Sequence, residues 1–527
     1  MEQYRVFEWT GNSSVVYDNP FKEVSLWGLF TCGLTSVRAD GFYEAGGRYA
    51  VRFCPDKAGL WSYVIHSSDP DLDGAQGTFT VEKAAPGNHG KVCLKNELVN
   101  SGDREDAYRF VYQDGTPFYP FGTTCSAWIN QSQKLQKETL ETLKNGPFNK
   151  IRMCIFPKFY TYNDYDPPAY AYEGGLKKDP ETLAKAEKDR SFEDYSFDYY
   201  RFNDAFFEHL EDCIRALDDI GVEVEIILLH PYDRWGFSRM GKDADLFYLS
   251  YVARRLGAFK NIWWSLANEY DLMPWKSNAD WDQYGRLIEA EDAGGHLRAI
   301  HQCMKLYDHG RPWITHASIQ RMDLYRTVEN ITEWRNDYGK PVIVDEAGYE
   351  GNVDYGWGSL SAQEETRRFW EGCLRGGYVT HGETYVDRGM QTIGYDQGNG
   401  LIKAQQIPAV WWAHGGKLYG QSPERIGFLR KILEEAPAGA RPIEREENPM
   451  EMWDSVGLRD GQKWYLYYYG FEHILYRNYQ LPAGHRYKIE RIDTWDMTVT
   501  PLDGIYEEKI RIRLGGKPYM AVRMTEV

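Results

Sequence analysis

One stretch, residues 261–270, constrains the fold of this chain more than any other. Its sequence, Asn-Ile-Trp-Trp-Ser-Leu-Ala-Asn-Glu-Tyr, runs through apolar or small residues without a helical period and then breaks at Asn268 and Glu269. A strand that is buried on both faces has this pattern when it ends at a functional surface. Residues 340–351 repeat the design, because another apolar run there ends at Asp345 and Glu346.

Two carboxylates that follow buried strands point to one kind of chemistry. The parallel strands of a (β/α)8 barrel bring the residues at their carboxyl ends around one pocket. Two carboxylates in one pocket are the minimal machinery of a glycosidase. For either segment alone, an ion pair or a place beside a helix N-cap would be the more frequent role of the glutamate. Because both segments occur, with helical stretches between them, we favour a pair that acts together.

Length and charge set the outer limits of the prediction. A chain of 527 residues is too long for one ordinary core and predicts two or three domains. The net charge of −17 argues against nucleic acid or an anionic membrane as the main partner, because both bind basic surfaces. The 18 Trp and 39 Tyr agree with a carbohydrate site, and aromatic β-sandwich cores would raise the same numbers.

The cysteines and the hydropathy pattern bear on location. Eight cysteines are scattered without a CxxC motif, which favours reduced thiols over a disulfide framework or a zinc site. No apolar run approaches the roughly 18 residues of a membrane span, and the first residues lack the features of a signal peptide. We therefore expect a cytoplasmic protein that needs no cofactor or metal, and the sequence leaves a homo-oligomer open.

The pattern of strands and helices divides the chain into three parts. Residues 1–86 hold short alternating strands and predict an immunoglobulin-like β-sandwich. Residues 87–438 alternate between strands and helices, which predicts a (β/α)8 TIM barrel as the catalytic domain. Residues 439–527 return to strand alternation and predict a small C-terminal β-sandwich. The expected fold class is thus a multidomain α/β and all-β protein.

Eight apolar runs are the expected strands of the barrel. They lie at 118–124, 149–156, 222–230, 261–268, 296–301, 313–320, 340–346 and 378–384. Helices are expected near 133–144, 201–219, 243–257, 279–293, 361–376 and 424–435. The connection between the fifth and sixth strands is short and shows no helical face, so these two strands are the least marked of the eight.

Several motifs together resemble a known family. The endings Asn268-Glu269 and Asp345-Glu346 are similar to the acid/base and nucleophile strand ends of the retaining (β/α)8 glycoside hydrolases. Their order, together with 349–351, 381–384 and 411–416, resembles bacterial glycoside hydrolases with an apiosidase-like barrel. The resemblance covers nearly the whole chain and implies a barrel between an N-terminal sandwich and a small C-terminal β-domain.

That resemblance implies a role for each glutamate. Glu269 would be the general acid/base and Glu346 the nucleophile, while Asn268 would bind the sugar hydroxyl next to the anomeric carbon. In such a mechanism Glu269 must first be protonated, and Glu346 must be ionised with help from donors such as Arg152 or Tyr349.

Other side chains are candidate substrate contacts. His230 ends the third strand and His316 lies on the sixth, where a purely structural histidine is about as frequent. Three tryptophans could be sugar platforms, although core packing is the slightly commoner role of any one: Trp128, Trp411 and Trp412. Glu383 ends the eighth strand and is a rival for either catalytic role.

Two other classes of function stay open. One is a non-catalytic carbohydrate-binding protein on a degenerate barrel, in which the two glutamates would have no chemical purpose. The other is a metal-dependent hydrolase that uses His230, His316 and acidic strand ends, although the sequence has no HxH or HExxH motif. Within the favoured hypothesis, long aromatic loops after the second, fourth and eighth strands predict a closed pocket and exo-action on short oligosaccharides.

Overall fold

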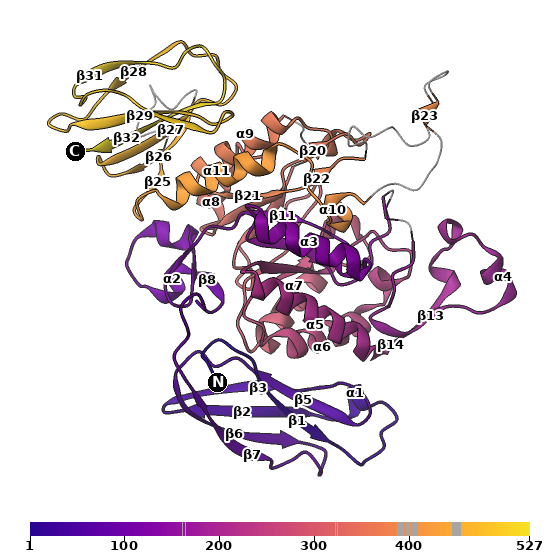
Figure 1. Cartoon of the computed structure of the whole chain (residues 1–527). Coiled ribbons are helices and arrows are strands. Elements are labelled where there is room, and N and C mark those ends of the chain that lie inside the picture. Colours follow the sequence, from indigo (N-terminus) through magenta and orange to yellow (C-terminus); the bar gives the residue numbers. More distant parts are fainter. Residues whose placement is uncertain are drawn as a thin grey trace.

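A central barrel lies between two β-rich regions in the computed structural model (Figure 1). The structure describes residues 1–160, 162–163, 165–321, 323, 325–386, 395–396, 401–402, 409–444 and 455–527. This architecture confirms the expected fold class. Within the described part of the chain, no helix combines the length and the apolar content that crossing a membrane requires.

The N-terminal region consists of two antiparallel sheets that enclose an aromatic core. One sheet has the order β1 (Phe7–Asn12), β5 (Arg48–Phe53), β4 (Phe42–Tyr43). The other has the order β3 (Thr35–Asp40), β2 (Leu26–Cys32), β6 (Gly59–Ser67), β7 (Gln76–Val81). Phe30, Val51 and Trp61 are fully buried between the sheets, because alternate residues of each strand face inward.

Eight parallel strands form the barrel, in the order β17-β16-β15-β12-β11-β21-β19-β18. Their bounds are β11 (Gly122–Thr124), β12 (Lys150–Cys154), β15 (Glu223–Leu229), β16 (Ile262–Ala267), β17 (Arg298–Ala299), β18 (Ala317–Gln320), β19 (Val342–Glu346) and β21 (Tyr378–His381). Each lies inside one of the eight expected segments. The barrel closes through short contacts, namely a parallel bridge between His301 and Ser318 and a 2.9 Å hydrogen bond from the Thr315 amide to the Arg298 carbonyl.

Helices surround the barrel, as the sequence predicts. They are α3 (Gln133–Asn145), α5 (Asp204–Asp219), α6 (Lys242–Leu256), α7 (Asn278–Glu291), α9 (Ala362–Leu374) and α11 (Ser422–Glu434), together with a short α8 (Ile331–Tyr338) that was not expected. Local sequence sets several of the starts. The Ser361 hydroxyl, for example, accepts a 3.2 Å hydrogen bond from the Glu364 amide at the first turn of α9.

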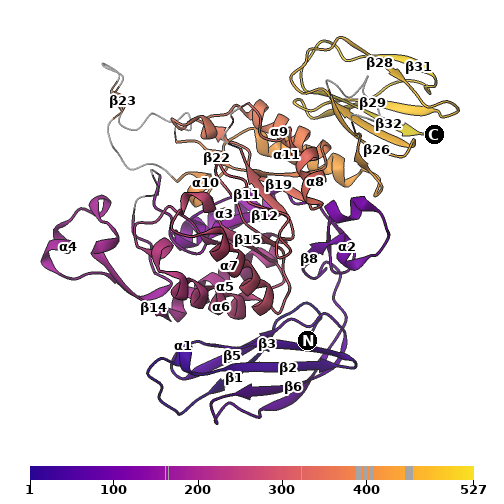
Figure 2. The same ribbon diagram turned by 180° about the vertical axis from the view of Figure 1, so that it is seen from behind.

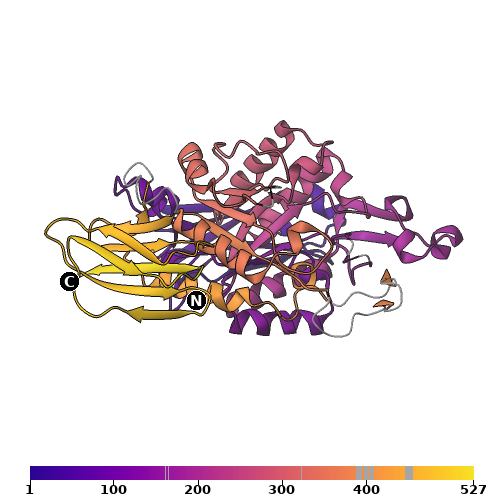
Figure 3. The ribbon, with the colours of Figure 1, turned by 90° about the horizontal axis from the view of Figure 1, so that it is seen from above.

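The C-terminal region packs against the barrel through α9. It holds a sheet of order β25 (Arg441–Pro442), β26 (Val456–Asp460), β27 (Trp464–Tyr468), β32 (Met520–Glu526), β29 (Tyr487–Asp493), β30 (Thr498–Pro501). A second sheet pairs β28 (Tyr476–Gln480) with β31 (Lys509–Arg513). On the far side of the barrel, the hairpin of β13 (Tyr172–Leu176) and β14 (Tyr195–Phe202) projects outward, as Figures 2 and 3 show.

Candidate active site

Glu269 and Glu346 lie at the carboxyl ends of two barrel strands, β16 and β19. Glu346 is the last residue of β19. Glu269 follows β16 by two residues and has a left-handed backbone, with φ 54° and ψ 58°. A non-glycine residue in this region is uncommon, and such positions gather at functional sites. The unusual backbone conformation of Glu269 therefore indicates that the position of this side chain is functionally important.

Hydrogen-bond donors surround the Glu269 carboxylate. The Gln320 amide donates to Oε1 at 2.7 Å, and the Tyr232 hydroxyl donates to Oε2. The Asn268 amide also reaches Oε2, at 3.3 Å. The Cys303 thiol is hydrogen-bonded to the same carboxylate, and burial together with the Glu269 charge raises the pKa of that thiol. Donors of this kind stabilise the charged form of a carboxylate.

Glu346 has fewer close partners than Glu269. Nη1 of Arg152 lies 3.6 Å from its Oε1, and Nδ1 of His301 lies 3.9 Å away. Only 17% of the Glu346 side chain is exposed. Burial, followed by the negative charge of Glu269, raises the pKa of Glu346 to about 7. The charges of the two carboxylates therefore interact, and below about pH 7 the pair holds a proton that an ordinary carboxyl would lose at a lower pH.

Arg152 connects the two strand ends. Its side chain is fully buried and pairs with Glu225 at 3.2 Å and Asp345 at 3.6 Å, in addition to Glu346. Nη2 donates to Oδ1 of Asn268 at 3.4 Å. Because the planar guanidinium has five donors in a fixed arrangement, it can hold all of these groups at once. Arg152 thus fixes the position of the end of β16, which leads to Glu269, relative to the end of β19, which carries Glu346.

Asp345 turns into the barrel interior, away from its neighbour Glu346. It accepts hydrogen bonds from the Ser318 hydroxyl at 2.6 Å and the Thr380 hydroxyl at 2.7 Å, and Nζ of Lys150 lies 3.3 Å away. Burial acts to raise the pKa of Asp345, but Lys150 and Arg152 outweigh it and hold the pKa below its usual range. Asp345 is therefore a fixed anion that anchors the floor of the site.

Comparison with known proteins shows the family of the chain. The family described as "Apiosidase-like, catalytic domain" matches residues 104–438, and two domains of unknown function, DUF5060 and DUF5605, match residues 1–68 and 453–525. The chain belongs to the apiosidase-like family. It is accordingly a glycoside hydrolase, and no curated protein matches the sequence.

Solved structures resemble all or most of this apiosidase-like chain. A Bacteroides vulgatus protein assigned to the glycoside hydrolases is 35% identical, with a TM-score of 0.86, over 100% of this chain and 99% of its own. A family 5 glycoside hydrolase of the same organism is 15% identical, with a TM-score of 0.57, over 84% of this chain and 94% of its own. The second likeness shows the shared fold alone.

Several predicted contacts of the apiosidase-like enzyme gather at the carboxyl end of the barrel. Asn268 and Arg152 touch the glutamate pair directly, as described above. Tyr349 is fully buried, and burial and the Glu346 charge raise its pKa. Its ring lies 6.3 Å from that of Trp412, which is 5% exposed. The Nε2–H of His230 donates to the Phe156 carbonyl at 3.2 Å, and burial lowers the pKa of His230 to about 3, so the ring is neutral.

Other predicted contacts lie elsewhere. Trp128 and Trp411 are buried in the main core, and the Trp411 indole donates to the Thr123 hydroxyl at 2.7 Å. His316 precedes β18 at the amino end of the barrel, where its ring packs against Trp263 with centroids 5.4 Å apart. His230 and His316 are therefore at opposite ends of the barrel. Within the described ranges, no group of three or more His, Cys, Asp and Glu side chains could hold a metal ion.

Glu383, the expected rival, is engaged by backbone amides. The amides of Tyr419 and Gly420 donate to its carboxylate at 2.8 Å and 2.7 Å. Glu350, which pairs with it across β20 (Glu350–Gly351) and β22 (Glu383–Thr384), accepts the amides of Gln421 and Ser422 in the same way. These two carboxylates thus accept hydrogen bonds from the backbone amides of the segment that leads into α11. This is a structural use of acidic residues at a helix start.

Four side chains of the site were not foreseen: Tyr232, His301, Cys303 and Gln320. Gln320 ends β18, so the rule that strand ends face the pocket could have found it. His301 ends the expected strand 296–301, so the same rule could have found it, whereas Tyr232 and Cys303 lie in loops beyond β15 and β17, where the sequence gives no periodic signal.

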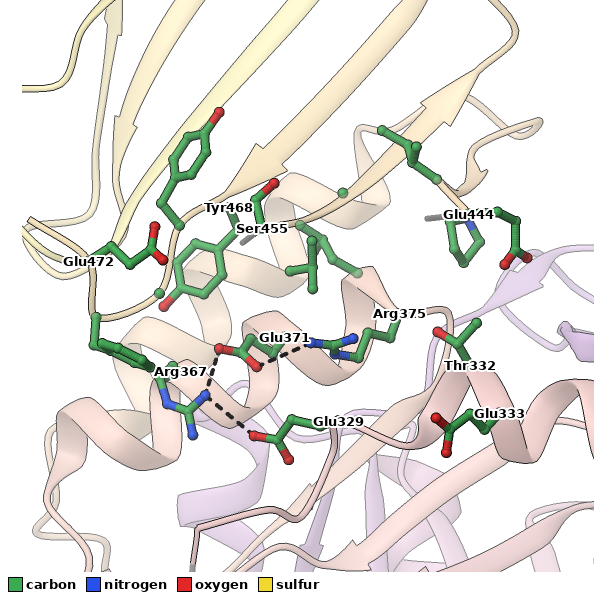
Figure 4. A pocket seen from close by; sticks show the side chains of 18 of the residues that line it. Glu329, Thr332, Glu333, Arg367, Glu371, Arg375, Glu444, Ser455, Tyr468 and Glu472 are labelled. Carbon is green, nitrogen blue, oxygen red and sulfur yellow. Dashed lines mark hydrogen bonds and ion pairs between the residues drawn. The ribbon is translucent and has the colours of Figure 1, made fainter. Parts of the chain in front are cut away.

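A separate cavity of about 650 Å³ lies between α8, α9 and the strands β26 and β27 (Figure 4). Its cations are paired, since Arg367 lies 2.6 Å from Glu371 and 3.7 Å from Glu329. The cavity is formed where the C-terminal sheet meets the barrel helices, and neither glutamate of the candidate active site lines it.

Proposed function

We propose that this enzyme is a retaining glycoside hydrolase in which Glu269 is the general acid/base and Glu346 the nucleophile. The observation that carries the proposal is the meeting of two strand ends at one buried arginine, since Arg152 contacts Glu346 and Asn268, the residue before Glu269, and the charge of Glu269 acts on the pKa of Glu346. Glu346 would attack the anomeric carbon while Glu269 protonates the leaving oxygen. Glu269 would then take a proton from the water that releases the sugar.

The proton held by the pair of glutamates is consistent with these two roles. The carboxylate of Glu269 accepts from several donors, while the raised pKa of Glu346 favours the protonated form of Glu346 before substrate binds. A sugar whose anomeric carbon becomes positive beside Glu346 reverses that preference, because an ionised Glu346 then gains a partner. We propose that the proton resides on Glu269 in the complex with substrate, where the leaving oxygen needs it.

We also propose a pocket and exo-action on short oligosaccharides. Aromatic residues from the loops after β12 and β19 pack beside the glutamates with Trp412 of the short helix α10 (Trp411–His414); the loop residues are Tyr160, Tyr162, Tyr349 and Trp357. The Tyr162 hydroxyl donates to Asp354 at 2.9 Å and ties the two loops together. A wall of this kind closes one side of a groove, which favours chain ends over internal bonds.

We also propose that the enzyme is cytoplasmic and that its partner is a carbohydrate. All eight cysteines are free thiols, which fits the reducing cytoplasm. The net charge of −17 supports a carbohydrate partner rather than nucleic acid or an anionic membrane.

A screen of aryl glycosides tests the proposed activity. Apiosides, arabinofuranosides and galactofuranosides should be included with the common pyranosides, and proton NMR of the first product should show retention of the anomeric configuration. Binding of sugars without hydrolysis of any glycoside would favour the non-catalytic alternative. Loss of activity on treatment with EDTA would favour the metal-dependent alternative, and a first product of inverted configuration would contradict the double displacement.

A further inference from the structure

Lys158, which follows β12, differs from two buried cations within that strand. Lys150 and Arg152 both contact Glu225 and Asp345, so their charges are balanced inside the protein. Lys158 is only 5% exposed. Yet within the part of the chain that the structure describes, its ammonium has no ion pair within 4.0 Å and no hydrogen bond. A buried charge without such a partner is rare and calls for a functional explanation.

Aromatic faces enclose the Lys158 ammonium. Nζ lies 4.3 Å from the ring centroid of Trp412, 4.5 Å from that of Tyr232 and 5.9 Å from that of Tyr160. The Asn163 amide donates to the Lys158 carbonyl and holds the loop in place. Ring faces attract a cation, but they do not replace the directed acceptors that the three N–H groups of an ammonium use.

The ammonium belongs to the active-site pocket. The Tyr232 ring that flanks it is the one whose hydroxyl holds Glu269. The positive charge of Lys158 opposes the rise in the pKa of Glu346 and helps to lower the pKa of His230. Neither glutamate comes within 4.0 Å of the ammonium, so both glutamates remain available to substrate. The N–H donors of Lys158 have no acceptor in the described part of the chain.

We propose that Lys158 binds the carboxylate of an acidic sugar, so that the preferred substrate is a glycoside containing a uronic acid. This inference rests on the proposed function, since it assumes that sugar occupies the pocket beside Glu269 and Glu346. A neutral sugar would stack on a bare aromatic face, but the near faces of Trp412 and Tyr232 are covered by charge. A carboxylate offers both the opposite charge and the acceptors that the ammonium lacks.

Calorimetric titration at constant ionic strength tests the inference. The probes are D-glucuronate, D-galacturonate and digalacturonate, each compared with its neutral counterpart, D-glucose, D-galactose or galactobiose. At least one uronate should bind the wild-type enzyme about tenfold or more tightly than its counterpart, since hydrogen bonds to charged groups are the stronger class. Lys158→Met should remove that preference and leave binding of the neutral sugars within about twofold, and Lys158→Arg should keep part of it.

A matched control and a second outcome keep the test decisive. Lys488→Met removes an exposed lysine from β29 in the C-terminal sheet and should leave the preference intact. Equal affinity for uronates and neutral sugars in the wild-type enzyme would overturn the role of Lys158, even if Lys158→Met did not fold. Hydrolysis of neutral glycosides would then still support the proposed function. Conversely, tight uronate binding without hydrolysis of any uronide would contradict the proposed function and leave the role of Lys158 standing.

Discussion

The Tyr232 hydroxyl donates a hydrogen bond to Oε2 of Glu269, so the loop after β15 holds the side chain that follows β16. These two strands are parallel neighbours, with Leu229 opposite Ala267 at their carboxyl ends. Residues a few positions beyond the ends therefore meet above the barrel. Burial, and then the charge of Glu269, raises the pKa of Tyr232, so the hydroxyl keeps its proton and acts only as a donor.

Removing that donor should weaken catalysis without unfolding the protein. Tyr232→Phe is expected to lower kcat/KM for a glycoside by about tenfold to a hundredfold, because a hydrogen bond to a charged group contributes about 1.5–3 kcal/mol. Steady-state kinetics on any hydrolysed glycoside measures the loss. Tyr270→Phe is the matched control, since its hydroxyl lies 3.5 Å from the Leu306 carbonyl and it should change kcat/KM less than about threefold. Equal losses in both variants would contradict a special role for Tyr232.

The pH dependence of the rate should reflect the shared proton. Because the pKa of Glu346 is about 7, the pair of glutamates holds one proton below that pH and loses it above. For a glycoside with a poor leaving group, kcat/KM should therefore fall as pH rises through about 7, since no carboxyl remains to protonate the leaving oxygen. An activated aryl glycoside should lose less over the same range. A flat profile up to pH 9 for the poor leaving group would be inconsistent with the shared proton.

The same proton predicts a dependence of stability on pH. The pKa of Glu346 in the folded protein is about 7, above the ordinary 4.5, so the folded form keeps a proton between these values that the unfolded form has lost. This stabilisation is complete below pH 4.5 and is lost as pH rises through 7; it amounts to on the order of 3 kcal/mol. Glu346→Gln cannot lose a proton, so its melting temperature should exceed that of the wild type by more at pH 8 than at pH 5. A difference that did not grow with pH would oppose this account.

Much of the barrel could be predicted because its strands are buried on both faces. Apolar runs such as 222–230 and 261–268 have no competing interpretation once helices lie between them. The sequence indicated the fifth and sixth strands only weakly, and in the structure the fifth strand, β17, has only two residues. No helix joins β17 to β18, which explains why residues 302–312 showed no helical face. The domain boundaries after residues 86 and 438 remain predictions.

The site was predictable only where a side chain ends a strand. That rule selected Glu269 and Glu346 as candidates, and it would also have selected His301 and Gln320. It could not separate Glu346 from Glu383, because both end strands and only the three-dimensional structure shows that backbone amides occupy Glu383. Nor could it assign Lys158, whose unpaired state depends on which carboxylates its neighbours already bind.

Glu383 should prove to be structural. Glu383→Gln removes the negative charge and replaces one of the two acceptor oxygens with an NH2 group, so the melting temperature should fall by an amount that corresponds to about 1–3 kcal/mol. In the folded fraction kcat should stay within about threefold of the wild type. Thermal unfolding and kinetics on the same preparation separate the two effects. A hundredfold loss of kcat at an unchanged melting temperature would instead return Glu383 to the list of catalytic candidates.

The two proposed catalytic glutamates should respond differently to the leaving group and to azide. Glu346→Ala should abolish turnover of every substrate, because no glycosyl-enzyme can form, and azide entering the vacated space should restore slow reaction with inverted product. Glu269→Ala should be mild on an activated aryl glycoside, whose departure needs no proton, and severe on a natural glycoside. The second step then lacks its base, so glycosyl-enzyme should accumulate and azide should release it with retained configuration.

Tyr270→Phe, beside Glu269 in the chain, is again the control for disturbance of this loop, and circular dichroism should show the same fold for all variants. Mass spectrometry of Glu269→Ala with an activated substrate should find a covalent sugar on Glu346, which ties the nucleophile to one residue. If both alanine variants lost activity equally on good and poor leaving groups and neither responded to azide, separate roles for Glu269 and Glu346 would be untenable. The raised pKa of Glu346 would then point to the reverse assignment, with Glu346 as the proton donor and Glu269, which accepts from four donors, as the attacking group.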